Sequence, residues 1–132
     1  MEINQIENIL KANEYLFSFL DIKILKMENG YCEMMMPFKK EFTRLGNILH
    51  GGIIMALIDY AGAIAVLSIN KKTNQFTQEL KINFLEPMTE GPFYCKGKVI
   101  KITDDNVAVV SIEFYDSKGK LGAKALGTWY MR

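Results

Sequence analysis

The stretch from Ile53 to Ile69 constrains the fold most strongly, because it is apolar at nearly every position. Its only polar side chains are Asp59, Tyr60 and Ser68. The stretch is too long for an ordinary strand, and its four alanines favour a helix. A helix that is apolar all round must be covered on nearly every side. The sequence therefore predicts a long buried helix that carries one carboxylate.

A transmembrane segment is the alternative interpretation of this stretch, and Asp59 argues against it. A charge at that depth is costly in lipid, and strand-like segments follow the stretch. The 132 residues, 49% hydrophobic and 23% charged, suit one globular domain that spans 1–132. The formal net charge of +1 gives no reason to expect nucleic acid or a membrane as a partner.

The cysteines and the N-terminal residues indicate a cytoplasmic protein. Cys32 and Cys95 lie far apart and form no C-x-x-C pattern, so we expect both to be reduced and in or near the core. The first residues include acidic side chains where an export signal needs positive charge. We therefore expect no export signal.

The segments around the apolar stretch predict a lead-in and a set of strands. Residues 1–20 have the spacing of a short amphipathic helix, either continuous or broken. Residues 22–38 predict a hairpin that turns at Asn29-Gly30, because both central residues of such a turn need positive φ. Residues 39–47 are expected to form a loop. Four more strands are expected over 76–86, 93–102, 107–116 and 120–132, with Phe76, Leu80, Ile82 and Phe84 on one face.

The short turns between these strands imply antiparallel neighbours. One sheet combined with one fully apolar helix predicts an α+β fold, in which a curved antiparallel sheet wraps around the long central helix. That architecture resembles the hotdog fold.

Two motifs in this order of elements resemble the phenylacetyl-CoA thioesterase-like (PaaI-like) acyl-CoA thioesterases. In "HGGIIMALID", His50 and two glycines open the central helix, and Asp59 follows nine residues after the histidine. In "TQELKINFLEPM", the residues are similar to the family's strand after that helix. The resemblance covers the chain from about Leu20 to its end. It implies hydrolysis of an acyl-CoA, with CoA as part of the substrate and no separate cofactor.

The resemblance also implies roles for the helix start and for the carboxylate. Unpaired N–H groups and a partial positive charge at a helix N-terminus suit an oxyanion. By resemblance the Gly51 N–H is the main donor, and Gly51 and Gly52 let a substrate carbonyl approach the backbone closely. Asp59 should face a cleft or a subunit interface, where it acts either as general base or as nucleophile.

Further site residues follow from the same resemblance. His50 is expected to orient the carbonyl or the departing thiolate, and Thr77 to position the attacking water. Asn83 is a weaker candidate for binding substrate. The family often has Asn six residues before the histidine, where this chain has Arg44. Either Arg44 or the nearby Asn47 is the candidate to replace that Asn in binding the substrate.

The spacing along the helix keeps the two groups apart, and the resemblance implies that two subunits share each site, with Asp59 of one meeting the helix N-terminus of the other. Gly52 and Asp59 are seven residues apart, which places them about 10 Å apart along the axis. We expect an obligate homodimer with two shared sites, assembled into a homotetramer.

One histidine and two distant cysteines cannot build an ordinary zinc site. A non-catalytic acyl-CoA sensor and a hotdog-fold hydratase or dehydratase are the alternative functions.

Overall fold

The computed structural model describes residues 1–132. The lead-in is a broken helix, as the sequence allowed: α1 (Ile3–Asn13) and α2 (Tyr15–Leu20) are separated by Glu14, whose backbone is extended. The predicted hairpin follows as β1 (Lys23–Glu28) and β2 (Tyr31–Met36). Its turn has φ of 49° at Asn29 and 80° at Gly30, which confirms the expected positive-φ pair.

The segment expected to be a loop, 39–47, contains a 3-10 turn, η1 (Lys40–Phe42), and the short strand β3 (Thr43–Arg44). This strand forms a small hairpin with β4 (Ile48–Leu49), which lies just after the segment. The long apolar helix is α3 (Gly51–Leu67). The four strands expected after it are all present: β5 (Gln75–Phe84), β6 (Phe93–Thr103), β7 (Val107–Tyr115) and β8 (Leu121–Met131).

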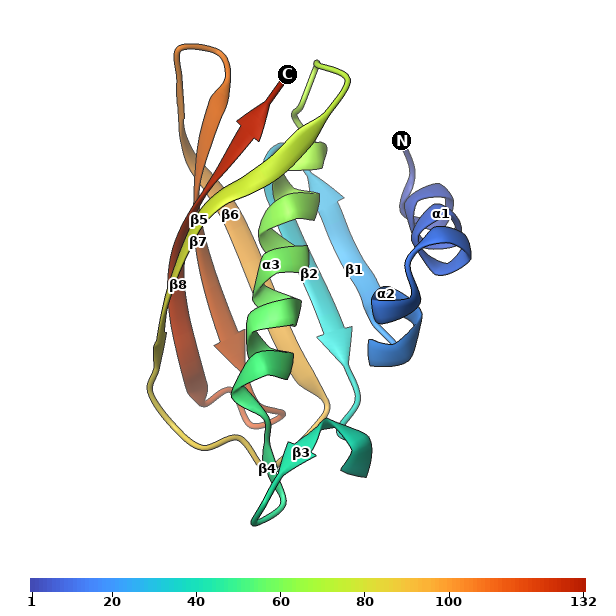
Figure 1. Ribbon diagram of the computed structural model, residues 1–132, viewed down its shortest axis with the longest axis vertical. Coiled ribbons are helices and arrows are strands. Elements are labelled where there is room, and N and C mark those ends of the chain that lie inside the picture. The colour runs from blue at the N-terminus through green and yellow to red at the C-terminus, as the bar shows by residue number, and fades with distance from the viewer.

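Six strands form one antiparallel sheet in the order β1-β2-β6-β7-β8-β5. The sheet curls around α3, while α1 and α2 lie beside β1 (Figure 1). This is the predicted α+β hotdog architecture. No helix is both long and apolar enough to cross a membrane.

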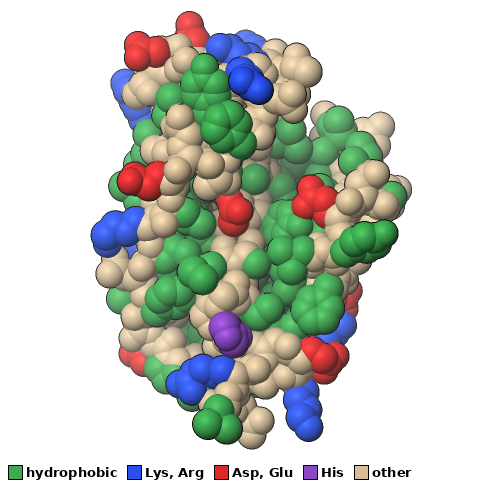
Figure 2. Space-filling view, in the orientation of Figure 1, with side chains coloured by type: hydrophobic (Ala, Val, Ile, Leu, Met, Phe, Trp, Pro, Cys, Tyr) green, Lys and Arg blue, Asp and Glu red, His purple; other side chains and the backbone are tan.

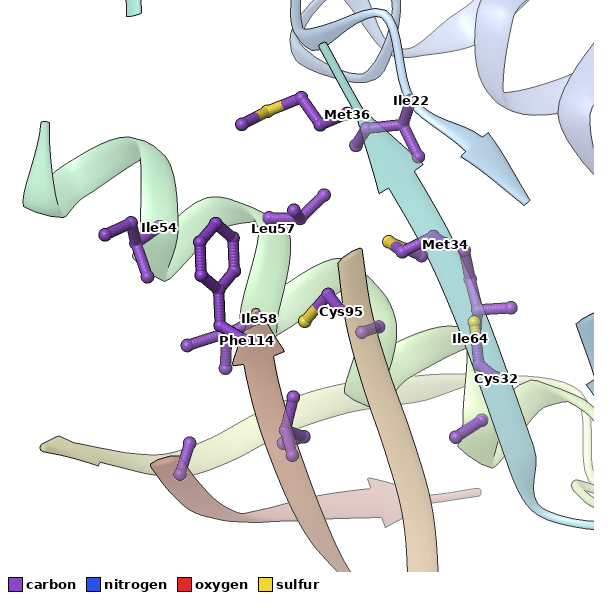
Figure 3. Close-up of a cluster of buried hydrophobic side chains, with 14 of the residues drawn as sticks. Ile22, Cys32, Met34, Met36, Ile54, Leu57, Ile58, Ile64, Cys95 and Phe114 are labelled. Atoms are coloured by element: carbon purple, nitrogen blue, oxygen red, sulfur yellow. The ribbon is translucent and has the colours of Figure 1, made fainter. Parts of the chain in front are cut away.

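The core lies between α3 and the concave face of the sheet. Leu57, Ile58 and Ile64 of α3 point toward β2, β6 and β7 (Figure 3). Cys32 and Cys95 lie in this core as buried, free thiols, which confirms the expectation for the two cysteines. Burial raises the pKa of the Cys32 thiol to about 12, so this group stays protonated at neutral pH.

Gly62 allows α3 to approach β8. A Cβ at this position would overlap Cη2 of Trp129, a buried side chain with 1% exposure. A helix interior normally disfavours glycine by about 1 kcal/mol relative to alanine. The absence of a side chain is therefore required here by packing against the indole ring.

Replacing Gly62 by Ala is expected to lower the free energy of unfolding by about 2 kcal/mol. The clash with a buried, closely packed ring outweighs the roughly 1 kcal/mol that alanine gains in helix propensity. Urea unfolding of the parent and of Gly62→Ala measures the difference. In a Trp129→Phe background the same substitution should lower the free energy of unfolding by a smaller amount, because residues 62 and 129 are in contact and their effects are coupled. An equal cost in both backgrounds would contradict the assigned contact.

The expectation that α3 is covered on nearly every side is wrong for the single chain. One face of the helix is open: Met55 is 46% exposed and Leu67 is 38% exposed. We call this the open face; its other members are partly exposed, namely Gly52, Ile53, Ala56, Asp59, Tyr60 and Ala63. The sheet covers only the opposite side of the helix because its two edges, β1 and β5, do not meet.

The prediction that Phe76 shares a face with Leu80, Ile82 and Phe84 is also wrong. The pairing of β5 with β8 shifts register between Thr77 and Glu79, so the alternation of side chains changes there. Phe76 is paired with Tyr130 and its ring lies 5.5 Å from that of Tyr130. The irregularity turns Thr77 toward α3, which positions one of the candidate site residues.

Candidate active site

The start of α3 is capped by the imidazole of His50. His50 Nδ1 accepts the N–H of Gly52 at 2.9 Å, and its carbonyl accepts the N–H groups of Ile53 and Ile54. A neutral imidazole that accepts at Nδ1 carries its proton on Nε2. The side chain is exposed and is the purple group on the molecular surface in Figure 2. The ring thus combines a capping acceptor with an outward-facing N–H donor.

The Gly51 N–H donates no hydrogen bond within the chain, whereas the next N–H, that of Gly52, is held by His50. Gly51 lines a cavity of about 350 Å³ together with Arg44, Ile54 and Phe84. The remaining lining comes from β4 and from the segment after β5: Ile48, Leu49, Leu85, Glu86, Pro87 and Met88. A free N–H at the positive end of a long helix can stabilise a developing oxyanion.

Asp59 is the only charged residue of α3 and lies on its open face. Asp59 Oδ1 accepts the hydroxyl of Thr77 at 2.7 Å. The bond joins α3 to the edge strand β5 and fixes the orientation of the carboxylate. Both residues line a second cavity of about 260 Å³, so the other carboxylate oxygen is available to a water or to a substrate.

Two residues that sequence reasoning missed lie next to Asp59. The hydroxyl of Tyr60 donates to Glu14 Oε1 at 2.6 Å, and both residues line the Asp59 cavity. Burial and this carboxylate raise the pKa of Tyr60, so its hydroxyl stays a donor. Tyr60 could have been suspected because it follows Asp59 directly. Glu14 gave no signal, because it is 46 residues away in the sequence.

The structure separates the other predicted binding residues. Arg44 lies in the Gly51 cavity, where its guanidinium also donates to the carbonyl of Leu45 at 2.8 Å. Asn47 lines a different hollow and has a φ of 59°, a left-handed conformation that asparagine tolerates in turns. Asn83 is exposed and accepts a hydrogen bond from Lys81.

The Gly51 cavity and the Asp59 cavity have no lining residue in common. Within one chain, the oxyanion donor and the carboxylate therefore face different hollows. No group of three or more His, Cys, Asp or Glu side chains stands close enough together to hold a metal ion.

Comparison with known proteins places these residues in a family. Residues 46–123, which include Gly51, Asp59 and Thr77, match the family model described as "Thioesterase superfamily". The protein named "Putative esterase SSO2140" from Saccharolobus solfataricus is 53% identical over 98% of this chain and 91% of its own length.

Solved structures show the same fold at low sequence identity. Thioesterase HI1161 from Haemophilus influenzae superposes with a TM-score of 0.89 at 20% identity, over 100% of this chain and 91% of that one. The E. coli PaaI protein from the phenylacetic acid degradation operon gives 0.87 at 22% identity, over 98% and 93% of the two chains. On the family match and the 53% identical relative, this chain belongs to the thioesterase superfamily of hotdog-fold proteins.

Proposed function

We propose that the protein hydrolyses acyl-CoA or aryl-CoA thioesters to the free acid and CoA. Membership in the thioesterase superfamily supports thioester hydrolysis in general. The observation that carries the proposal is the Asp59 carboxylate, held by Thr77 at 2.7 Å beside a cavity on an otherwise uncharged helix. Its place on the open face leaves the carboxylate accessible to a substrate while the hydrogen bond from Thr77 fixes its orientation, as a catalytic base or nucleophile requires.

The reaction proceeds by attack on the thioester carbonyl. As a general base, Asp59 takes a proton from water, the resulting hydroxide adds to the carbonyl carbon, and the oxyanion is held by the Gly51 N–H. Collapse of this intermediate breaks the C–S bond and releases the CoA thiolate, which takes up a proton. The Nε2–H of His50 is placed to donate to the carbonyl or to the thiolate.

Asp59 can instead attack the carbonyl itself. The carboxylate oxygen then displaces the CoA thiolate and forms a mixed anhydride, which water cleaves to restore Asp59 and release the acid. Both routes require the negative charge of Asp59 and a donor for the oxyanion. In either case the Thr77 hydroxyl holds one carboxylate oxygen of Asp59 in place through its hydrogen bond.

The site is shared between two subunits in this proposal. Gly51 and Asp59 are eight residues apart, about 12 Å along the helix axis, which is too far for one carbonyl to meet both. A second copy whose α3 lies antiparallel on the open face brings its Asp59 to the first copy's Gly51. The edge strand β5 is the edge left for pairing between subunits, because the other edge strand, β1, already contacts α1. We propose a homodimer of this kind, paired further into a homotetramer.

We place the reaction in the cytoplasm. Two buried, free cysteines suit a reducing compartment. No cofactor other than the CoA of the substrate is required by either route.

Thiol release from a panel of straight-chain and aryl acyl-CoAs tests the proposal. A coloured thiol reagent follows the CoA formed, and Cys32 and Cys95 add little background because both are 0% exposed. The proposal expects turnover of at least one group of these thioesters. Tight binding without thiol release would instead support a non-catalytic acyl-CoA sensor. If the protein neither binds nor cleaves any of these thioesters, both functions are contradicted.

A further inference from the structure

We infer that the lead-in, residues 1–20, forms the specificity wall of the Asp59 cavity, with Leu16 limiting the size of the acyl group. This inference rests on the proposed function. It is carried by the composition of the cavity, whose seven lining residues include two from the lead-in, Glu14 and Leu16. Both precede residues 46–123, the part that matches the family model.

The cavity has three sides of different character. Ala56, Tyr60 and Ala63 lie with Asp59 along the open face of α3, spaced by three or four residues. Thr77 of β5 lies on the second side. The lead-in supplies the third side. Leu16 is the only large aliphatic side chain of the lining, because the helix contributes only the methyl groups of Ala56 and Ala63 as aliphatic surface.

Buried contacts hold the lead-in against the domain. Phe17 is fully buried and meets the ring of Tyr60 edge to face, with centroids 5.4 Å apart and planes at 77°. Leu20 is also fully buried, and Ile6 of α1 is 4% exposed. Glu7 Oε2 accepts the backbone N–H of Ile24 in β1 at 2.6 Å. Both helices of the lead-in, α1 and α2, are therefore anchored to the domain.

The hydrogen bond between Tyr60 and Glu14 links this wall to the catalytic helix. Glu14 lies at the break between α1 and α2, where its own N–H donates to the carbonyl of Leu10 at 2.8 Å. Its side chain accepts from the residue that follows Asp59, at 2.6 Å. Leu16 stands between two anchored residues, Glu14 and Phe17, so its backbone position is set while its side chain remains 47% exposed.

The partial exposure of Leu16 makes it a good residue to alter. A change of side-chain volume there should change the cavity without emptying the core. One methylene in an apolar pocket changes discrimination between substrates by about 10-fold to 200-fold. Leu16→Trp should therefore disfavour long acyl groups relative to short ones, and Leu16→Ala should shift the preference toward longer ones.

The test is kcat/KM for straight-chain acyl-CoAs, from acetyl- to dodecanoyl-CoA, with the parent and both Leu16 variants. For the longest thioester that the parent uses well, we expect Leu16→Trp to lower kcat/KM at least tenfold relative to the shortest one. Tyr15→Ala is the matched control: Tyr15 is the neighbouring residue of α2, is 94% exposed and does not line the cavity. Its ranking of substrates should equal that of the parent.

Binding of S-alkyl-CoA thioethers, which cannot be hydrolysed, separates this inference from the proposed function. Calorimetry should show the same shift in chain-length preference even in a protein without turnover. If the parent hydrolyses acyl-CoA but both Leu16 variants keep its ranking of substrates and of thioethers, the wall assignment is overturned while the function stands. A parent that neither cleaves nor binds any of them overturns both.

Discussion

Asp59→Asn is expected to lower kcat for acyl-CoA hydrolysis by about 10²–10⁴-fold, the usual contribution of a positioned acid or base. The substitution preserves the shape of the side chain and its Oδ1, which can still accept the hydrogen bond that Thr77 now gives at 2.7 Å. It removes only the charge and the basicity. Thiol release under saturating substrate measures the effect.

The matched control for this substitution is Asp104→Asn. Asp104 is exposed in the turn before β7 and has a φ of 51°, a conformation that asparagine also adopts readily. The control should retain parental activity. Circular dichroism and gel filtration should give the same fold and assembly for all three proteins. A fully active Asp59→Asn variant would contradict both catalytic routes, because each needs the carboxylate.

Gly51→Pro is expected to lower kcat by about 10²–10³-fold, the usual effect of losing one oxyanion donor. Gly51 is the first residue of α3, a position where proline is well tolerated because that N–H is not used by the helix. His50 before it is extended, with φ of −65° and ψ of 134°, as a residue preceding proline should be. The substitution thus removes the N–H while the helix start is retained.

Gly51→Ala separates the loss of the donor from the effect of added bulk. A Cβ at Gly51 would lie 3.7 Å from the ring of Phe84, which is ordinary van der Waals contact. The alanine variant keeps the N–H and should retain most of the activity. If alanine and proline reduce kcat equally, crowding of the cavity explains the loss and the oxyanion assignment is wrong.

Much of the fold could be predicted because periodicity and turn residues are local signals. The apolar run gave α3, Asn29-Gly30 gave the first hairpin, and alternating residues gave the four later strands. The orientation of Phe76 was predicted wrongly, since the register shift between Thr77 and Glu79 arises from pairing with β8. Local alternation carries no information on such an irregularity.

The candidate site was partly predictable for the same reason. Gly51 and Asp59 lie on one helix and His50 caps it, so their spacing in the sequence defined their arrangement, and the structure adds the hydrogen bond from Thr77. The contribution of Glu14 and Leu16 could not be predicted, because it depends on how the lead-in docks through Phe17. The presence of asparagine at position 47 is explained by the left-handed conformation of the turn there. From the sequence alone, this structural reason cannot be told apart from a role in binding.

The most direct test of the shared site is the activity of mixed dimers. One chain carries Asp59→Asn and the other Gly51→Pro; the two are co-expressed with different tags and purified through both. If each site takes Gly51 from one subunit and Asp59 from its partner, one of the two sites is intact. We predict up to about half of the parental kcat per dimer, whereas each variant alone is nearly inactive; a tetramer that pairs two homodimers carries both tags but no intact site. Inactive mixed dimers, alongside an active doubly tagged parent, would contradict the shared site.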